Sequence, residues 1–201
     1  METEGALMQI LTMPVGAYQT NCYLVCGEKD QCVLIDPGYQ AEEILAQAQR
    51  LGKVVAAILL THGHFDHVGA VADIAAQTDC KVYICEKEKA LPETFTAGKL
   101  YYTHTYDQGD TITEAGLTFE VLHTPGHTPG SVCLLCGDVM FSGDTLFAGS
   151  IGRTDFPGGD WGTIKASLGR LSELSADYRV LPGHGEETTL SFEKKTNPYM
   201  Q

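Results

Sequence analysis

The stretch THGHFDH, residues 61–67, places three imidazoles and one carboxylate side by side. It directly follows the apolar run VVAAILL at residues 54–60, which predicts a buried strand. Imidazole nitrogen and carboxylate oxygen are ligands that borderline metals such as zinc prefer. Residues i and i+2 of an extended backbone point to the same side, so His62 and His64 can reach one ion. Asp66 and His67 follow a bend and can serve a neighbouring ion. A metal site is favoured over a chance surface cluster, because the carboxylate and imidazoles stand at the end of a buried strand.

Three further fragments can complete such a site. They are His127 within HTPGHTPG (123–130), Asp144 within FSGDT (141–145) and His184 within LPGHG (181–185). Each follows a strand-like run and lies in a turn rich in glycine or proline. Loops at strand ends are where a rigid scaffold presents functional side chains. Any one of these residues alone would be interpreted as a turn Asp or a solvated His, but together with residues 61–67 they predict one shared site.

The composition predicts one soluble domain and limits its partners. The 201 residues are enough for a single full core. Thirteen basic and 26 acidic residues give a net charge of −13, which argues against a nucleic-acid or anionic-membrane partner. Two bound divalent ions would offset part of that charge, and the rest is typical of a solvated surface. The pattern does not predict an oligomeric state, and we expect a small-molecule substrate.

The cysteines predict a reducing compartment. Seven cysteines fall mostly in strand-like runs, which is typical of buried apolar thiols. The spacing CLLC at residues 133–136 resembles a zinc or redox pair, but in a strand its two thiols would point to opposite faces. Residues 1–11 lack the basic and apolar regions of a signal peptide, and no run is long enough to cross a bilayer. We therefore predict a cytoplasmic protein.

Periodicity predicts an α/β layered domain in which strands alternate with helices. Besides residues 54–60, strands are expected at 7–13, 21–26, 31–35 and 81–85, and hairpins at 111–122 and 132–141, turning at Ala115-Gly116 and Gly137-Asp138. Helices are expected at 41–51, along the apolar stripe 68–75, at 161–171 with Asp160 as its cap, and near Glu186.

The order HxHxDH, then His, Asp and His, resembles the metallo-β-lactamase fold superfamily from Gln19 to the C-terminus. The resemblance implies a four-layer αββα sandwich with the metal loops along one edge. TPGHTPGS (124–131), GDTLF (143–147) and PGHG (182–185) resemble glyoxalase II-type hydrolases. GRTDFPGGD (152–160) and KKTNPY (194–199) resemble a short bacterial branch of that group.

The resemblance implies two metal ions and assigns their ligands. The first ion would be held by His62, His64 and His127, and the second by Asp66, His67 and His184, with Asp144 as the bridge. These ligands suit zinc best, with iron and manganese as alternatives. The nucleophile would be a hydroxide held between the ions and oriented by Asp66. No general acid is evident, which fits a thiolate leaving group and a thioester such as S-D-lactoylglutathione.

Several neighbouring residues have two interpretations. Arg153 matches the position of a cation for the glutathione carboxylate, or it pairs with Asp155 or Asp160. Asp36 supports a ligand from outside or is only a turn residue, and Thr61 and Ser142 are further candidates for such support. His123 is expected to be packed or hydrogen-bonded. His104 is expected in a loop near the mouth of the cleft, among aromatics at 101–106 that line a channel or cover the core.

The length of the chain limits the comparison with glyoxalase II. Full-length enzymes carry a C-terminal helical domain that contacts glutathione, whereas residues 1–201 are expected to form a single metallo-β-lactamase-like domain without it. The main alternative is a persulfide dioxygenase with one iron, which shares a similar GRTDF stretch, although the PGHG context favours the hydrolase. Asp66 and the GDTLF pattern argue against a β-lactamase, and the complete ligand set argues against a non-catalytic protein.

Overall fold

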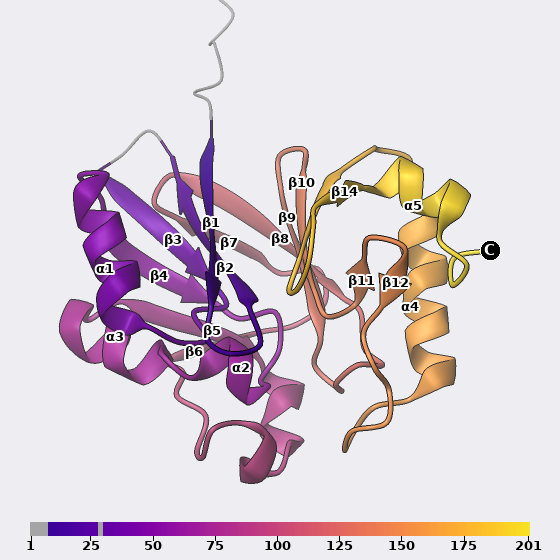
Figure 1. Ribbon diagram of the computed structural model, residues 1–201, viewed down its shortest axis with the longest axis horizontal. Helices are drawn as coiled ribbons and strands as arrows, with labels where there is room; N and C mark the ends of the chain where they lie inside the picture. The colour runs from indigo at the N-terminus through magenta and orange to yellow at the C-terminus, as the bar shows by residue number, and fades with distance from the viewer. Residues whose placement is uncertain (1–7, 28–29) are drawn as a thin grey trace, which may run out of the picture.

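Two six-stranded sheets pack against each other, and helices cover the outer face of each (Figure 1). The computed structural model describes residues 8–27 and 30–201. Its layers follow the order helix, sheet, sheet, helix, which confirms the αββα sandwich expected from the sequence.

The first sheet has the strand order β1-β2-β3-β4-β5-β6. Its strands are β1 (Gln9–Val15), β2 (Thr20–Cys26), β3 (Gln31–Ile35), β4 (Val54–Leu59), β5 (Lys81–Cys85) and β6 (His104–Tyr106). The first three are antiparallel, and β3 to β6 are parallel. The first predicted strand is shifted by two residues, and residue 7 lies outside the described residues. Parallel strands need crossovers, which α1 (Ala41–Arg50) and the pair α2 (Phe65–Val68) and α3 (Val71–Thr78) supply.

The second sheet has the strand order β14-β13-β10-β9-β8-β7. Its strands are β7 (Thr111–Glu114), β8 (Leu117–His123), β9 (Val132–Cys136), β10 (Val139–Gly143), β13 (Arg179–Pro182) and β14 (Thr188–Thr189). Both predicted hairpins are confirmed, because Ala115, Gly116 and Gly137 have the positive φ that tight turns require. A separate hairpin pairs β11 (Leu146–Phe147) with β12 (Ser150–Ile151).

Three apolar clusters hold the layers together. The central cluster lies between the sheets and includes Phe119 and Phe141 of the second sheet and Ile35 of the first. One outer cluster packs α1 and α3 on the first sheet, and the other packs α4 (Trp161–Glu173) and α5 (Leu190–Thr196) on the second. Asp160 caps α4 as predicted, because its Oδ1 accepts a hydrogen bond from the Thr163 amide at 2.7 Å.

The cysteines behave as buried apolar residues. All seven are free and buried. Cys133 belongs to the outer cluster under α4, whereas Cys136 belongs to the cluster between the sheets. This confirms that the two thiols of the CLLC stretch point to opposite faces. Burial raises the pKa of both to about 11, which keeps them as unreactive thiols.

Two local predictions are wrong. The last helix begins at Leu190 and not near Glu186, because residues 188–189 first pair with β13 and Thr189 then caps the helix. His104 is not in a loop but on the edge strand β6, where its ring stacks on Tyr83 with centroids 4.8 Å apart.

The short 3-10 turns η1 (Glu86–Ala90) and η2 (Glu93–Phe95) connect β5 to β6. No helix within the described residues is long and apolar enough to span a bilayer.

Candidate metal centre

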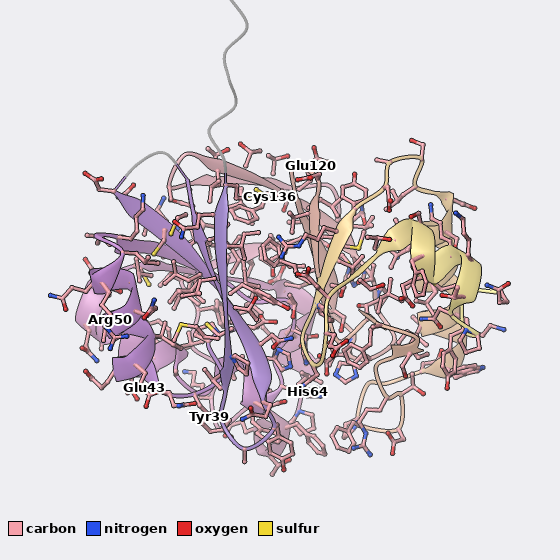
Figure 2. The ribbon with its side chains drawn as sticks, turned by 45° about the horizontal axis from the view of Figure 1, so that its top comes forward. Tyr39, Glu43, Arg50, His64, Glu120 and Cys136 are labelled. Atoms are coloured by element: carbon pink, nitrogen blue, oxygen red, sulfur yellow. The ribbon has the colours of Figure 1, made fainter. Side chains whose placement is uncertain are left out.

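Four loops meet at one end of the sandwich and bring together all seven side chains predicted as ligands. The loops follow β4, β8, β10 and β13, and each begins where an apolar strand ends. His64 marks this end, while Glu120 and Cys136 lie at the opposite end (Figure 2). His62, His64, His67, Asp66 and His127 are buried, and Asp144 and His184 are partly buried.

The first group is His62, His64 and His127, whose nearest ring nitrogens all lie within 4.8 Å of one another. Nδ1 of His64 is 2.9 Å from Nε2 of His127. Burial lowers the pKa of all three imidazoles, that of His64 to about 3. Each ring is therefore neutral and presents a lone pair, which is the form that binds a metal.

The second group is Asp66, His67 and His184. Their nearest ligand atoms, one carboxylate oxygen and two ring nitrogens, also lie within 4.8 Å of one another. Oδ2 of Asp66 lies 3.3 Å from Nε2 of His184 and 3.8 Å from Nε2 of His67. Burial opposes protonation of both imidazoles, but the nearby carboxylates outweigh it and raise the pKa of His67 and His184. This group therefore attracts positive charge, and a dication would compete with protons for it.

Asp144 lies between the two groups. Its Oδ1 is 3.4 Å from Nε2 of His67, and its Oδ2 is 3.6 Å from Nε2 of both His127 and His184. Burial opposes ionisation of Asp144, but His67 and the other imidazoles outweigh burial and hold its pKa well below its usual range. A shared carboxylate in this position can screen two dications from each other at roughly 3.5–4 Å.

The polar atoms of the centre fit bound cations. Four buried atoms have no hydrogen-bond partner within the described part of the chain: Nε2 of His62, His64 and His67, and Oδ1 of Asp144. Burying a polar atom without a partner costs about 1–3 kcal/mol, so such atoms are rare in folded proteins. All four belong to the two groups or to the carboxylate between them, and nitrogen and oxygen donors of this kind suit divalent zinc, iron or manganese.

Asp36 orients the second group from outside. One of its oxygens accepts from the Thr61 amide at 2.7 Å, and the other accepts from the Thr61 hydroxyl at 2.5 Å and faces Nδ1 of His67 at 2.9 Å. Fixing Nδ1 in this way directs Nε2 of His67 toward Asp144. The two interpretations of Asp36 are compatible, since it also has a turn-like φ of 50°. Thr61 supports His62, with Oγ1 3.1 Å from its Nδ1.

Ser142 does not support a ligand, contrary to the sequence prediction. Its hydroxyl donates to the Leu146 carbonyl at 2.7 Å and so holds the turn after β10. Thr20, which the sequence analysis missed, takes such a role instead. Its hydroxyl donates to Oδ2 of Asp66 at 3.1 Å. A threonine at the start of β2 has no local sequence signal that would single it out.

We expect Asp36→Asn to lower metal affinity by about 10–100-fold, because an amide nitrogen in place of Oδ2 cannot accept from Nδ1 of His67. Competition with a chromophoric chelator measures the change. Ser142→Ala is the matched control, since it removes a buried hydrogen bond in the same region that reaches no ligand. Equal affinities in Asp36→Asn and the unaltered protein would show that Asp36 is only a turn residue.

Glu88 joins two of the ligand loops and was also missed. It is fully buried, and its two oxygens accept from the amide of Gly63 at 2.5 Å and that of Gly130 at 2.6 Å. Gly63 stands between His62 and His64, and Gly130 follows His127. Burial raises the pKa of Glu88 even though these donors favour the carboxylate. The carboxylate therefore ties together the loops that carry the first group.

One glycine is required by the close packing of the centre. A Cβ at Gly183 would overlap Oδ1 of Asp144 and lie 2.7 Å from Cε1 of His67. Glycine thus lets the loop that carries His184 approach the other ligands. The first glycine of the PGHG stretch is therefore needed because a side chain would not fit there.

The centre opens into a cleft of about 460 Å³ with aromatic walls. Besides five of the predicted ligands, the cleft is lined by Tyr18, Phe65, Phe147, Arg153 and Phe156. Tyr18 and Phe65 pack edge to face, with centroids 5.4 Å apart. The walls are mainly apolar, and among the described residues that line the cleft Arg153 is the one arginine or lysine.

Arg153 forms the predicted pair with Asp155 at the wall of the cleft. Its guanidinium makes two hydrogen bonds to Asp155, at 2.7 and 2.8 Å, and lies 3.6 Å from the ring centroid of Phe156. The same side chain lines the cleft. In addition, its backbone carbonyl lies 2.7 Å from Nδ1 of His127 and so fixes the orientation of that ring.

Three further residues that the sequence analysis considered near the site lie outside the cleft: His123, Tyr106 and His104. Nε2 of His123 bonds to the Pro129 carbonyl at 2.9 Å, which confirms a hydrogen-bonded role. Tyr106 is buried and donates to the Leu60 carbonyl, so it covers the core. His104 is exposed on β6 and does not line the cleft, which corrects its predicted place at the mouth.

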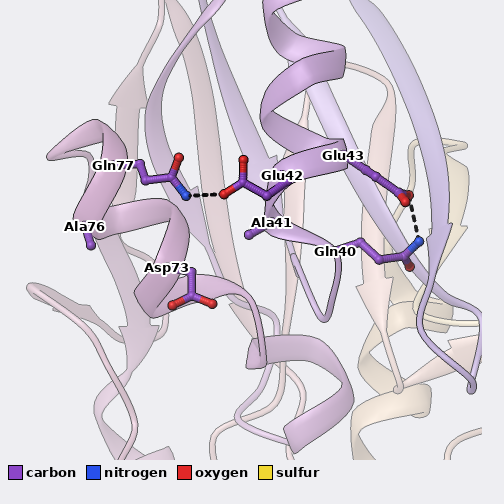
Figure 3. A pocket seen from close by; sticks show the side chains of 7 residues that line it. All are labelled: Gln40, Ala41, Glu42, Glu43, Asp73, Ala76 and Gln77. Atoms are coloured by element: carbon purple, nitrogen blue, oxygen red, sulfur yellow. Dashed lines mark hydrogen bonds between the residues drawn. The ribbon is translucent and has the colours of Figure 1, made fainter.

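A second hollow lies between α1 and α3, and hydrogen bonds join some of the side chains that line it (Figure 3). Gln77 donates to Glu42 at 2.9 Å, and Gln40 donates to Glu43 at 2.7 Å. The first of these bonds links the two helices. The described residues that line this hollow offer carboxylates and amides but no imidazole.

The sequence and fold match known proteins over nearly the whole chain. Residues 15–184 match the Metallo-beta-lactamase superfamily domain. Hydroxyacylglutathione hydrolase GloC of Haemophilus influenzae is 36% identical, with 96% of this chain and 98% of that protein covered. The probable metallo-hydrolase YqgX of Bacillus subtilis is 37% identical, with 94% of this chain and 95% of that protein covered.

Solved structures agree. The BLEG-1 B3 metallo-beta-lactamase has a TM-score of 0.89 and 35% identity, with 96% of this chain and 100% of that chain covered. TTHA1623 in a di-iron-bound form has a TM-score of 0.84 and 42% identity over 94% of this chain and 99% of that one. ETHE1 from Myxococcus xanthus has a TM-score of 0.83 and 30% identity, with 95% of this chain and 84% of that chain covered. The chain therefore belongs to the metallo-β-lactamase superfamily.

Proposed function

We propose that the protein is a binuclear metallohydrolase that cleaves thioesters such as S-D-lactoylglutathione. The observation that carries the proposal is the pair of ligand groups sharing Asp144 at the floor of one cleft. The 36% identity to a hydroxyacylglutathione hydrolase supports the substrate class. His62, His64 and His127 would hold one ion, and Asp66, His67 and His184 the other.

The ions, when bound, would lower the pKa of a water molecule to near neutrality and polarise the substrate carbonyl. The chain's own residues prepare this chemistry. Asp66 is held by Thr20 and His184, which leaves it placed to orient the attacking water. The aromatic side chains that line the cleft would restrict solvent around a bound substrate carbonyl. A thiolate is a good leaving group, so the reaction needs no separate general acid.

We propose zinc as the metal, with iron and manganese as alternatives. The mixed imidazole and carboxylate donors suit all three ions. The similar TTHA1623 is described in a di-iron-bound form, which supports iron in a related site. Metal analysis of protein purified from its own host identifies the ion.

We propose that Arg153 binds a carboxylate of the substrate. Its side chain lines the cleft, and a guanidinium binds carboxylates through two parallel hydrogen bonds. Asp155 now occupies both of those positions, so a substrate carboxylate would have to replace it. The stacking of Arg153 on Phe156 would keep the guanidinium in place during that exchange.

A persulfide dioxygenase with one iron is the second candidate. The observation that favours it is the likeness to ETHE1 from Myxococcus xanthus, at a TM-score of 0.83 and 30% identity. The second group and Asp144 give this chain ligands for two ions, which favours the hydrolase. The likeness to a B3 metallo-beta-lactamase makes a β-lactam substrate a further arm of the test.

One experiment separates these activities. Metal-loaded protein is assayed against a thioester panel that includes S-D-lactoylglutathione, against a chromogenic cephalosporin, and for oxygen uptake with glutathione persulfide. We expect thioester hydrolysis to be the fastest reaction, with two ions per chain. Oxygen uptake with one iron per chain would favour the dioxygenase, and the absence of thioester turnover would reject the proposal.

We also propose that residues 1–201 act as one domain, in the cytoplasm, on small molecules and not on nucleic acids or membranes. The single cluster between the two sheets supports one domain. The seven free, buried thiols fit a reducing compartment, and the net charge of −13 would repel polyanions. Fractionation of the host cell tests the location.

A further inference from the structure

The tail KKTNPY lies next to a buried polar pair that the metal centre does not use. Glu193 of α5 and Asn197 directly after it are both fully buried. One oxygen of Glu193 accepts from the amide of Gly149 at 2.9 Å and from Nδ2 of Asn197 at 2.8 Å. Its other oxygen accepts from the Thr188 hydroxyl at 2.7 Å. A buried carboxylate is costly unless it is hydrogen-bonded, and Glu193 is.

Asn197 continues the same contact. Its Nδ2 donates to the carbonyls of Ser150 at 3.1 Å and Phe147 at 3.4 Å, and its Oδ1 accepts from the amide of Tyr199 at 3.0 Å. Glu193 and Asn197 together therefore bind three backbone groups of the β11–β12 hairpin, at residues 147, 149 and 150. We call this pair the hairpin clamp.

The hairpin needs such support. Its strands β11 and β12 have two residues each and pair only with each other, outside both large sheets. An isolated two-stranded hairpin is marginally stable in water. The clamp hydrogen-bonds the backbone of residues 147, 149 and 150, in addition to the bond from Ser142 of β10 to the Leu146 carbonyl.

The hairpin carries one wall of the cleft and leads to another part of it. The ring of Phe147 lines the cleft, with its centroid 6.2 Å from that of His184. The chain then passes Gly152, which packs closely against Asp144, and reaches Arg153. The position of the hairpin thus sets the wall at Phe147 and the start of the segment that carries Arg153.

We propose that Glu193 and Asn197 are positioning residues that hold the β11–β12 hairpin in the place where the cleft binds its substrate. The clamp acts through Phe147 and Arg153 and touches neither ligand group. This proposal rests on the proposed function in one respect, that the substrate binds in the cleft. Loss of the clamp should therefore weaken substrate binding and leave metal binding and the chemical step largely unchanged.

The test uses Asn197→Ala, which frees the carbonyls of Phe147 and Ser150. We expect amide exchange in residues 146–151 to accelerate about tenfold, KM to rise about tenfold, and kcat and metal content to stay within about twofold. The single tryptophan gives a further signal, since Trp161 packs against Tyr199 with centroids 5.9 Å apart and its fluorescence should change when Tyr199 loses its bond to Asn197.

Thr188→Val is the matched control, because it removes one bond to Glu193 on the side that does not reach the hairpin. It should leave exchange in the hairpin and KM unchanged. If Asn197→Ala does not fold, Asn197→Ser fills more of the space but is too short to reach both carbonyls, and it should show the same changes at a smaller size, about threefold.

Amide exchange is measured without substrate, so its result stands even if no thioester is hydrolysed. Unchanged exchange in the hairpin would overturn the clamp itself. Faster exchange with unchanged KM for the substrate that the unaltered protein hydrolyses would overturn its role in positioning. A loss of metal or a fall in kcat alone would also overturn the proposal, because the pair would then act on the metal centre.

Discussion

Replacing Asp66 by alanine is expected to lower kcat by about 10²–10⁴-fold while the fold stays intact. The carboxylate contacts His184 and His67, accepts from Thr20, and lines the cleft, so its loss removes a proposed ligand and the group that would orient the attacking water. The fold should survive because Asp66 lies in the short helix α2 at the cleft and not in an apolar cluster. Steady-state kinetics, circular dichroism and metal analysis measure the three quantities.

Asp73→Ala is the matched control for Asp66→Ala. It makes the same substitution and the same change in net charge on α3, beside the hollow of Figure 3. We expect it to keep normal turnover and metal content. Near-normal turnover in Asp66→Ala itself would show that Asp66 has no role in the reaction.

Asp144→Asn should have an effect of similar size through a different cause. An amide has nearly the same shape but no negative charge to share between two dications, so we expect the metal content to fall from two ions per chain towards one. Metal ions supply several kcal/mol to such reactions, so kcat should fall by about 10²–10⁴-fold. Emission spectrometry of the dialysed protein, together with kinetics, measures both.

The control for Asp144→Asn is Asp138→Asn, which makes the same change at an exposed hairpin turn of the second sheet. It should retain two ions and full turnover. If Asp144→Asn also kept two ions and normal turnover, the carboxylate between the groups would not be a bridge.

The ligand positions could be predicted from the sequence because each follows a strand that the apolar pattern indicates. Residues 54–59, 139–143 and 179–182 form apolar strands that end at the metal loops. Strands 139–143 and 179–182 are parallel neighbours, so their carboxyl ends lie at the same edge of the sheet. Metal chemistry then selects histidine and aspartate from the many polar residues in those loops. These two constraints predicted an α/β domain with one shared metal site. The four-layer sandwich and the assignment of seven ligands to two ions came from the resemblance to the metallo-β-lactamase fold superfamily.

The supporting carboxylates of Glu88 and Glu193 could not be predicted in this way. Glu88 stands in EKEKA and Glu193 in SFEKKT, where neighbouring charges are typical of a solvated surface. Their burial depends on loops far away in the sequence, which supply Gly63 and Gly130 to one and Gly149 to the other. Hydrogen bonds to backbone amides leave no pattern of side chains in the sequence.

Arg153 illustrates a second limit. The sequence allowed a substrate contact or a pair with Asp155 or Asp160, and the structure shows the pair with Asp155 at the cleft. The contact between its carbonyl and His127 was not predictable, because every residue has a carbonyl and only the path of the chain decides where it points.

The most direct measurement is anomalous diffraction from crystals of the metal-loaded protein. We expect two ions per chain, one among His62, His64 and His127 and one among Asp66, His67 and His184, with Asp144 in contact with both. A single ion, or ions bound anywhere else on the chain, would contradict this expectation.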